Sequence, residues 1–181
     1  MRKQLIQGLV LLVVLGTAIT ACFVEPNYSD TPEIRYLSLS KYTLEASTGV
    51  GRPKRDSLIV TINFQDGTGD LGENTQDTAR QRTVFGKETW GNYEIKTFQL
   101  IGPNKYEELP LAVLSKLYFP KLTRDGQKGS IEGILDFSQS FPYQRNFKLV
   151  PVKFQVRIRD RALHVSNVIE TDKYRISGVS L

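Results

Sequence analysis

The sequence has very few of the residue types on which many catalytic and metal sites depend. It contains one cysteine, Cys22, and one histidine, His164, in 181 residues. A zinc site built from cysteine and histidine is excluded by number alone, because such sites use three or four of these ligands. A disulfide within the chain is excluded as well, so the fold must depend on a hydrophobic core. Hydrophobic residues make up 40% of the chain, which is sufficient for one.

Long apolar runs are also missing, since no stretch reaches the roughly 20 residues that a membrane-spanning helix needs. The N-terminus carries a shorter pattern instead. Arg2 and Lys3 precede an apolar run over 9–16, and small residues occupy most of 17–21. This order of charge, apolar run and small residues is typical of a secretory signal peptide.

The cysteine stands directly behind this segment, in the order Ile19, Thr20, Ala21, Cys22. This order resembles the lipobox of bacterial lipoproteins. The resemblance implies a diacylglycerol thioether on the Cys22 sulfur, cleavage before Cys22 and acylation of the new amine. Residues 1–21 are then the signal peptide, 22–32 a lipidated flexible tether and 33–181 the folded domain. The alternatives are a secretory signal followed by a free thiol and an uncleaved membrane segment, and both leave a lone thiol in an oxidising compartment.

The net charge and the residue after Cys22 indicate which partners and which membrane we expect. The chain has 24 basic and 19 acidic residues, and removal of the signal peptide takes away two bases, which leaves a net charge of +3. The bases are scattered apart from Arg52, Lys54 and Arg55, so no nucleic-acid partner is predicted. Position 23 is Phe. In diderm bacteria an Asp directly after the lipidated Cys resembles an inner-membrane retention signal. Its absence here predicts that the protein is located at the outer membrane, which it would contact through the lipid anchor.

Short alternating segments rich in β-branched and aromatic residues predict an all-β fold. Residues 152–160 alternate throughout, which places Arg157 and Arg159 on the outward face. The polar stretch 65–92 is predicted to be a long loop without a helix, and 111–119 is ambiguous between strand and helix. Turn signals between seven or so strands favour a two-sheet β-sandwich. The predicted strands are 34–44, 57–64, 93–101, 130–137, 152–160 and 164–171.

Two segments resemble a group of small bacterial lipoproteins with one immunoglobulin-like domain. Residues 64–72 (FQDGTGDLG) resemble the acidic loop of these proteins, and 160–167 (DRALHVSN) resemble their last hairpin. The resemblance implies an immunoglobulin-like β-sandwich. Thr68 stands where an Asp is usual, and Leu163-His164 stand where Gly-Asn is usual.

The acidic loop is a candidate calcium site. Asp66 and Asp70 supply carboxylates, and the glycines between them let backbone carbonyls turn inward, which suits a cation that takes six to eight oxygen ligands. In an immunoglobulin-like sandwich this loop and the last hairpin lie at the same end, so Asp160 and Asn167 are further candidate ligands. The alternative is that these residues only build turns, with Asp160 bonded to its own hairpin backbone.

No catalytic constellation is apparent, so we expect a protein without enzymatic activity. Ser166, His164 and Asp160 are too close in sequence to converge as a triad. The expected role is a lipid-anchored binding or assembly module of the cell envelope with a protein partner. An accessory carbohydrate- or surface-polymer-binding role is the alternative, for which Trp90 and Tyr93 are the candidate exposed rings if they do not pack in the core.

Overall fold

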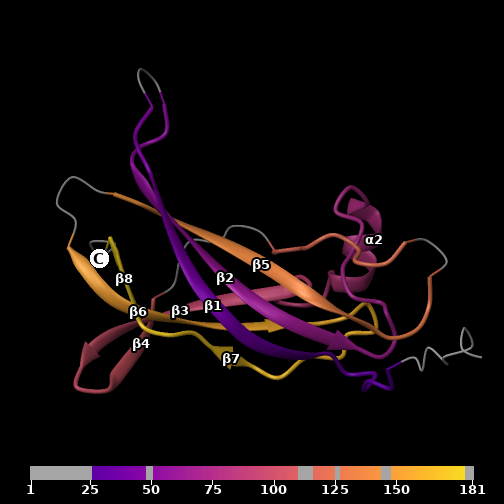
Figure 1. Cartoon of the computed structure of the whole chain (residues 1–181). Coiled ribbons are helices and arrows are strands. Elements are labelled where there is room, and N and C mark those ends of the chain that lie inside the picture. The colour runs from indigo at the N-terminus through magenta and orange to yellow at the C-terminus, as the bar shows by residue number, and fades with distance from the viewer. Residues whose placement is uncertain (1–25, 48–50, 110–115, 125–126, 144–147, 178–181) are drawn as a thin grey trace, which may run out of the picture.

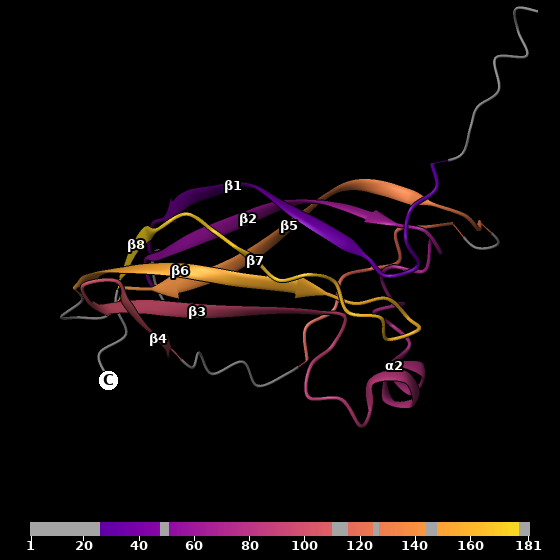
Figure 2. The same ribbon diagram turned by 90° about the horizontal axis from the view of Figure 1, so that it is seen from below.

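Eight strands and one helix form the regular structure in the computed structural model, which describes residues 26–47, 51–109, 116–124, 127–143 and 148–177. The strands form two antiparallel sheets packed face to face (Figures 1 and 2). One sheet has the order β1-β2-β5, and the other has the order β4-β3-β6-β7, with β8 also paired to β6. The elements are β1 (Glu33–Leu44), β2 (Arg55–Asp66), α2 (Thr78–Phe85), β3 (Tyr93–Gly102), β4 (Lys105–Leu109), β5 (Ile131–Pro142), β6 (Leu149–Ile158), β7 (Ile169–Glu170) and β8 (Tyr174–Ser177).

The predicted all-β fold of two packed antiparallel sheets is therefore confirmed. The first, second and fifth strands share one sheet, while the third, fourth and sixth share the other. The predicted signal peptide and Cys22 lie outside the described residues.

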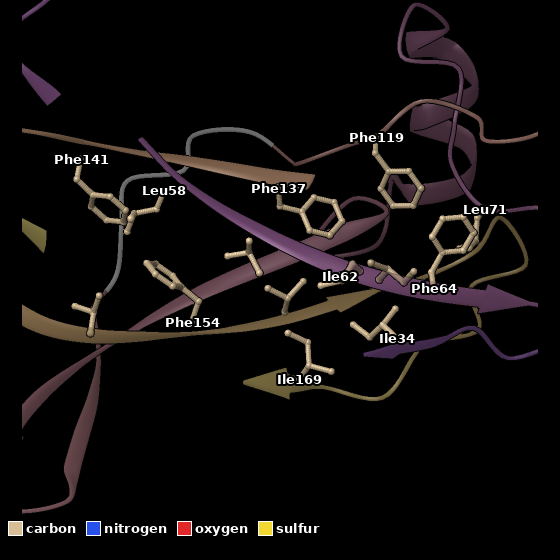
Figure 3. Packing of buried hydrophobic residues seen from close by; sticks show 14 of the residues in the cluster. Ile34, Leu58, Ile62, Phe64, Leu71, Phe119, Phe137, Phe141, Phe154 and Ile169 are labelled. Carbon is tan, nitrogen blue, oxygen red and sulfur yellow. The ribbon is translucent and has the colours of Figure 1, made fainter. Parts of the chain in front are cut away.

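The core lies between the central strands of the two sheets. Every second residue of β2 is buried, and the same alternation runs through the second half of β6, as predicted. Apolar side chains from the two sheets point toward one another across the layer (Figure 3). Phe141 of β5 lies 5.9 Å from Phe154 of β6 between ring centroids. Full burial of one such side chain contributes about 1.5–3 kcal/mol, so these strands hold the sandwich together.

The stretch 65–92 contains the helix α2, so the prediction of a loop without a helix is wrong. Only one helix residue, Phe85, is buried, which is why no amphipathic pattern signalled it. Its ends are capped instead. The Asp77 carboxylate accepts a hydrogen bond from the Arg80 backbone N–H at 2.9 Å, and Lys116 Nζ donates to the Phe85 carbonyl.

Two further differences concern short strands. The polar strand β4 was not predicted, because its sequence KYEEL carries little apolar alternation. The predicted strand 164–171 is only partly formed, since β7 covers two of its residues and β8 follows after a break. Of the ambiguous segment 111–119, residues 116–119 are described, and Leu117 makes an isolated bridge to Tyr93.

The prediction that Arg159 faces outward is also wrong, since only 2% of the residue is exposed. The strand β6 ends at Ile158, so the strict alternation of faces stops before Arg159. Its guanidinium donates to the carbonyls of Gly91 and Trp90 and to Glu88 Oε2. One buried cation therefore fastens the end of the 65–92 stretch to the end of β6.

Candidate metal site

Three acidic side chains meet at one end of the sandwich. Asp66 is the last residue of β2, Asp70 lies in the loop that follows, and Asp160 follows β6. One carboxylate oxygen from each lies within 4.8 Å of the other two. Asp66 and Asp160 are fully buried. An isolated bridge between Leu71 and Asp160 holds the loop against the hairpin, so the structure brings together three of the four predicted ligands.

Two glycines are required for this loop to take its path. Gly69 and Gly72 have φ angles of +66° and +84°, in the left-handed region that favours glycine. A Cβ on Gly69 would lie 2.3 Å from the Gly129 carbonyl oxygen, and one on Gly72 would lie 2.1 Å from that of Pro120. The loop thus packs directly on neighbouring backbone, which holds the backbone of its two aspartates close together.

Thr68 stands between two of the carboxylates. Its hydroxyl lies 2.6 Å from Asp70 Oδ1 and 3.4 Å from both oxygens of Asp66. Asp66 Oδ2 also accepts the Asp70 backbone N–H at 3.1 Å, which closes the turn. Thr68 thus places a neutral hydroxyl between the carboxylates of Asp66 and Asp70.

The single histidine belongs to this cluster, which the sequence did not reveal. The His164 backbone N–H donates to Asp160 Oδ1 at 2.8 Å, and His164 Nδ1 lies 2.8 Å from Asp160 Oδ2. The His164 side chain remains about half exposed. The only available signal was the four-residue spacing of the pair across a tight turn, where Leu163 takes a φ of +71°.

The crowding of charge affects the protonation of these groups. Burial, with a further contribution from the charge of Asp70, raises the pKa of Asp66 to about 6. Burial also raises the pKa of Asp160. The hydrogen bond to Asp160 raises the pKa of His164 above its ordinary value. Between about pH 4 and pH 6 the Asp66 carboxyl therefore holds a proton that a solvent-exposed carboxyl would have lost, because burial and the charge of Asp70 both disfavour its ionised form.

Asn167, the fourth predicted ligand, has a different set of partners. Its Oδ1 accepts the Ile34 backbone N–H and its Nδ2 donates to the Ile34 carbonyl, both at 2.8 Å.

The Ser166 hydroxyl accepts the Ile158 N–H and donates to the Asn167 carbonyl. Ser166 is thus bonded to backbone rather than to His164, and this geometry does not form a triad.

The two aromatic residues considered for carbohydrate binding are not exposed. Trp90 is 9% exposed and stacks on Arg159, with the guanidinium 4.1 Å from the ring centroid. Tyr93 stacks on Phe137 at 4.5 Å between centroids and packs against the core. Both rings therefore take the core-packing role, and they offer no flat platform for a sugar.

The chain enters the domain beside the acidic loop. The Gly67 backbone N–H donates to the Ser29 carbonyl at 2.8 Å, and the Tyr28 hydroxyl donates to Glu132 Oε2 at 2.6 Å. Pro32 is buried. The last residues of the predicted tether thus lie against the domain, at the end opposite the β1–β2 hairpin (Figures 1 and 2).

The described part of the chain contains no helix with the length and hydropathy needed to cross a membrane. The cluster itself offers oxygen ligands at a rigid loop, a donor set that suits a hard divalent cation. Comparisons with protein-family models, curated proteins and solved structures found no match for this chain.

Proposed function

We propose that this protein is a lipid-anchored, non-enzymatic binding or assembly module of the bacterial cell envelope, held at the outer membrane through Cys22. We further propose that Asp66, Asp70 and Asp160 bind Ca²⁺ at the anchored end of the domain. The observation that carries the proposal is the convergence of three carboxylates beside the point where the chain enters the sandwich.

Calcium suits this place for an electrostatic reason. Three carboxylates within 4.8 Å of one another repel when ionised, and two of them are buried. A divalent cation would neutralise that repulsion, and backbone carbonyls and water would complete its coordination. Because Thr68 supplies a neutral hydroxyl where the related loops have a carboxylate, we expect a weak site, with Kd on the order of 10⁻⁴–10⁻³ M as in extracellular modules.

A bound cation would also affect how the domain is oriented on its tether. The acidic loop bonds to Ser29 through Gly67, so a cation that orders the loop also fixes the direction in which the tether leaves the domain. The opposite end of the sandwich, with the β1–β2 hairpin, would then face away from the membrane (Figure 1).

Membrane fractionation with an acyl-chain label tests the anchor. We expect the Cys22→Ser protein to be released from membranes or to stall as the uncleaved precursor, while wild type and Asp70→Asn are labelled and stay attached. Two or three acyl chains make attachment practically permanent, since each buried CH₂ contributes about 0.8 kcal/mol. A wild-type protein that fractionates with membranes and carries no lipid label would contradict the proposal.

A further inference from the structure

The two sheets differ in how their edges are protected. An open edge strand presents a row of unpaired backbone N–H and C=O groups, and natural proteins shield such rows with bulges, short strands, charges or covering segments. The edge strands here are β1 and β5 in the first sheet and β4, β7 and β8 in the second (Figure 1). One of the five, β5, has acidic side chains but neither a bulge nor a short length.

The edge of β1 is shielded in two ways. Its pairing with β2 shifts by a bulge between Tyr36 and Ser38, which twists the strand. The Asn167 side chain also bonds to both backbone groups of Ile34, in the place where a neighbouring strand would bind. In the second sheet β4 has five residues, β7 has two and β8 has four, so each is too short to offer a long edge.

Residues 131–140 of β5 have neither a bulge nor a side chain from another described segment bonded across their outer backbone edge. The strand pairs with β2 over all 12 of its residues without a shift in register. Residues 131–140 contain no proline and no lysine. Among the described residues, only β2 forms hydrogen bonds to the backbone of 131–140. In an antiparallel ladder alternate residues direct their backbone groups to opposite sides, so half of these groups point away from β2.

The side chains on the solvent face of this strand indicate what can bind there. Glu132, Ile134 and Asp136 follow one another along that face. Ile134, at 64%, is the most exposed large hydrophobic residue in the described part of the chain. The two carboxylates accept hydrogen bonds from neutral groups, the hydroxyls of Tyr28 and Thr61, and no described cation pairs with either.

This row of charges favours one occupant over another. A second copy of β5 would bring further carboxylates beside these two, and like charges on neighbouring strands repel. A strand with basic residues two positions on either side of an apolar one would place a cation beside each carboxylate and an apolar group beside Ile134.

We propose that the edge of β5 over residues 131–140 binds an extended basic segment of a partner protein by strand addition, with Glu132 and Asp136 flanking its lysines or arginines and Ile134 contacting its apolar residue. This mode takes affinity from backbone hydrogen bonds and specificity from alternate side chains. It rests on the proposed binding or assembly role and names the surface and the partner chemistry for it.

A short peptide tests the edge on the full-length lipidated protein in detergent. The probe is a fluorescent peptide with the core Lys-Thr-Val-Thr-Lys, followed by anisotropy, with hydrogen exchange to locate it. We expect saturable binding that slows amide exchange within 131–140. Replacement of both peptide lysines by glutamate, or N-methylation of alternate peptide amides, is expected to weaken binding at least tenfold.

Matched variants decide whether β5 is the site. Ile134→Lys is expected to weaken binding of the basic peptide at least tenfold, whereas Val168→Lys, at an exposed apolar residue just before β7, is expected to leave it within twofold. Asp136→Lys provides a second test should Ile134→Lys fail to fold. The inference would be overturned if the acidic or N-methylated peptide bound as tightly as the basic one, or if the peptide slowed amide exchange outside 131–140. It would also be overturned if the protein formed a dimer without peptide and the dimer slowed amide exchange within 131–140. Because lipid labelling is measured separately, a labelled protein that binds no peptide refutes this inference and leaves the proposed anchoring intact.

Discussion

Arg159 and Asp160 are neighbours in the sequence, yet the two buried charges have opposite surroundings. Arg159 donates to two carbonyls and to Glu88, and its guanidinium lies over the rings of Trp90 and Phe85. Its positive charge is surrounded by partners that favour it. Such an arrangement fixes one conformation of the arginine side chain.

Asp160 belongs to a group in which the charges oppose one another. It shares its site with Asp66 and Asp70, and the described group with a possible positive charge that bonds to its carboxylate is His164. The cluster is kept together by the glycine loop rather than by mutual attraction. The comparison indicates that the arginine holds the fold together, whereas the acidic cluster has a capacity for a cation that the fold itself does not use.

The largest expected change in the free energy of unfolding comes from replacing Arg159. Arg159→Met removes the only donor to the carbonyls of Gly91 and Trp90 among the described residues, and breaking a buried pair in this way lowers the free energy of unfolding by about 3 kcal/mol or more. The control is Arg157→Met, since Arg157 is partly exposed and pairs with Glu94, and we expect a loss of about 1 kcal/mol or less. Urea unfolding measures both. Equal losses would mean that burial of Arg159 contributes nothing beyond a surface ion pair.

A smaller effect is expected from the backbone of the acidic loop. Gly72→Ala places a methyl group 2.1 Å from the Pro120 carbonyl oxygen at a positive φ, and strain of this kind lowers the free energy of unfolding by roughly 1–3 kcal/mol. Gly102→Ala is the control, because its nearest contact would be 3.9 Å away on the Lys105 side chain. A Gly72→Ala protein as stable as the control would show that the loop relaxes easily and does not force the carboxylates together.

The third prediction is a dependence of stability on pH, measured in chelator. The pKa of Asp66 is raised to about 6 from 3.8, so the folded state binds a proton that the unfolded state releases, and stability falls as pH rises between these values. The raised pKa of His164 acts in the same direction, because stability is lost as pH rises through the folded value. Asp66→Asn should flatten the decline between about pH 4 and pH 6. A wild-type protein whose melting temperature rises across that range would contradict the assignment of protons to the cluster.

The sequence predicted what depends on alternation and on topology. The buried faces of β2 and of the second half of β6 follow from strict alternation. The meeting of Asp66 and Asp160 follows from the immunoglobulin-like strand order, which puts the loop after β2 and the last hairpin at one end. Both are long-range consequences of simple repeating patterns.

The remaining features depend on single contacts that no pattern encodes. The helix α2 buries only Phe85, so it has no periodic signal. Arg159 is buried because the strand ends one residue before it and carbonyls surround it there. Asn167 bonds to Ile34 across 133 residues of sequence, and no local rule distinguishes that amide from a metal ligand.

The most direct test of the acidic cluster is a thermal melt of the full chain in chelator and in about 10 mM Ca²⁺, for wild type and Asp70→Asn. With Kd on the order of 10⁻⁴–10⁻³ M, the ion stabilises the folded wild type by about 1.4–2.7 kcal/mol. This corresponds to roughly 3–10 °C in Tm for a domain of this size. We expect Asp70→Asn to lose most of that shift. Equal Tm values for wild type in chelator and in Ca²⁺, or a shift that persists in Asp70→Asn, would contradict the account and leave these aspartates as turn-forming residues.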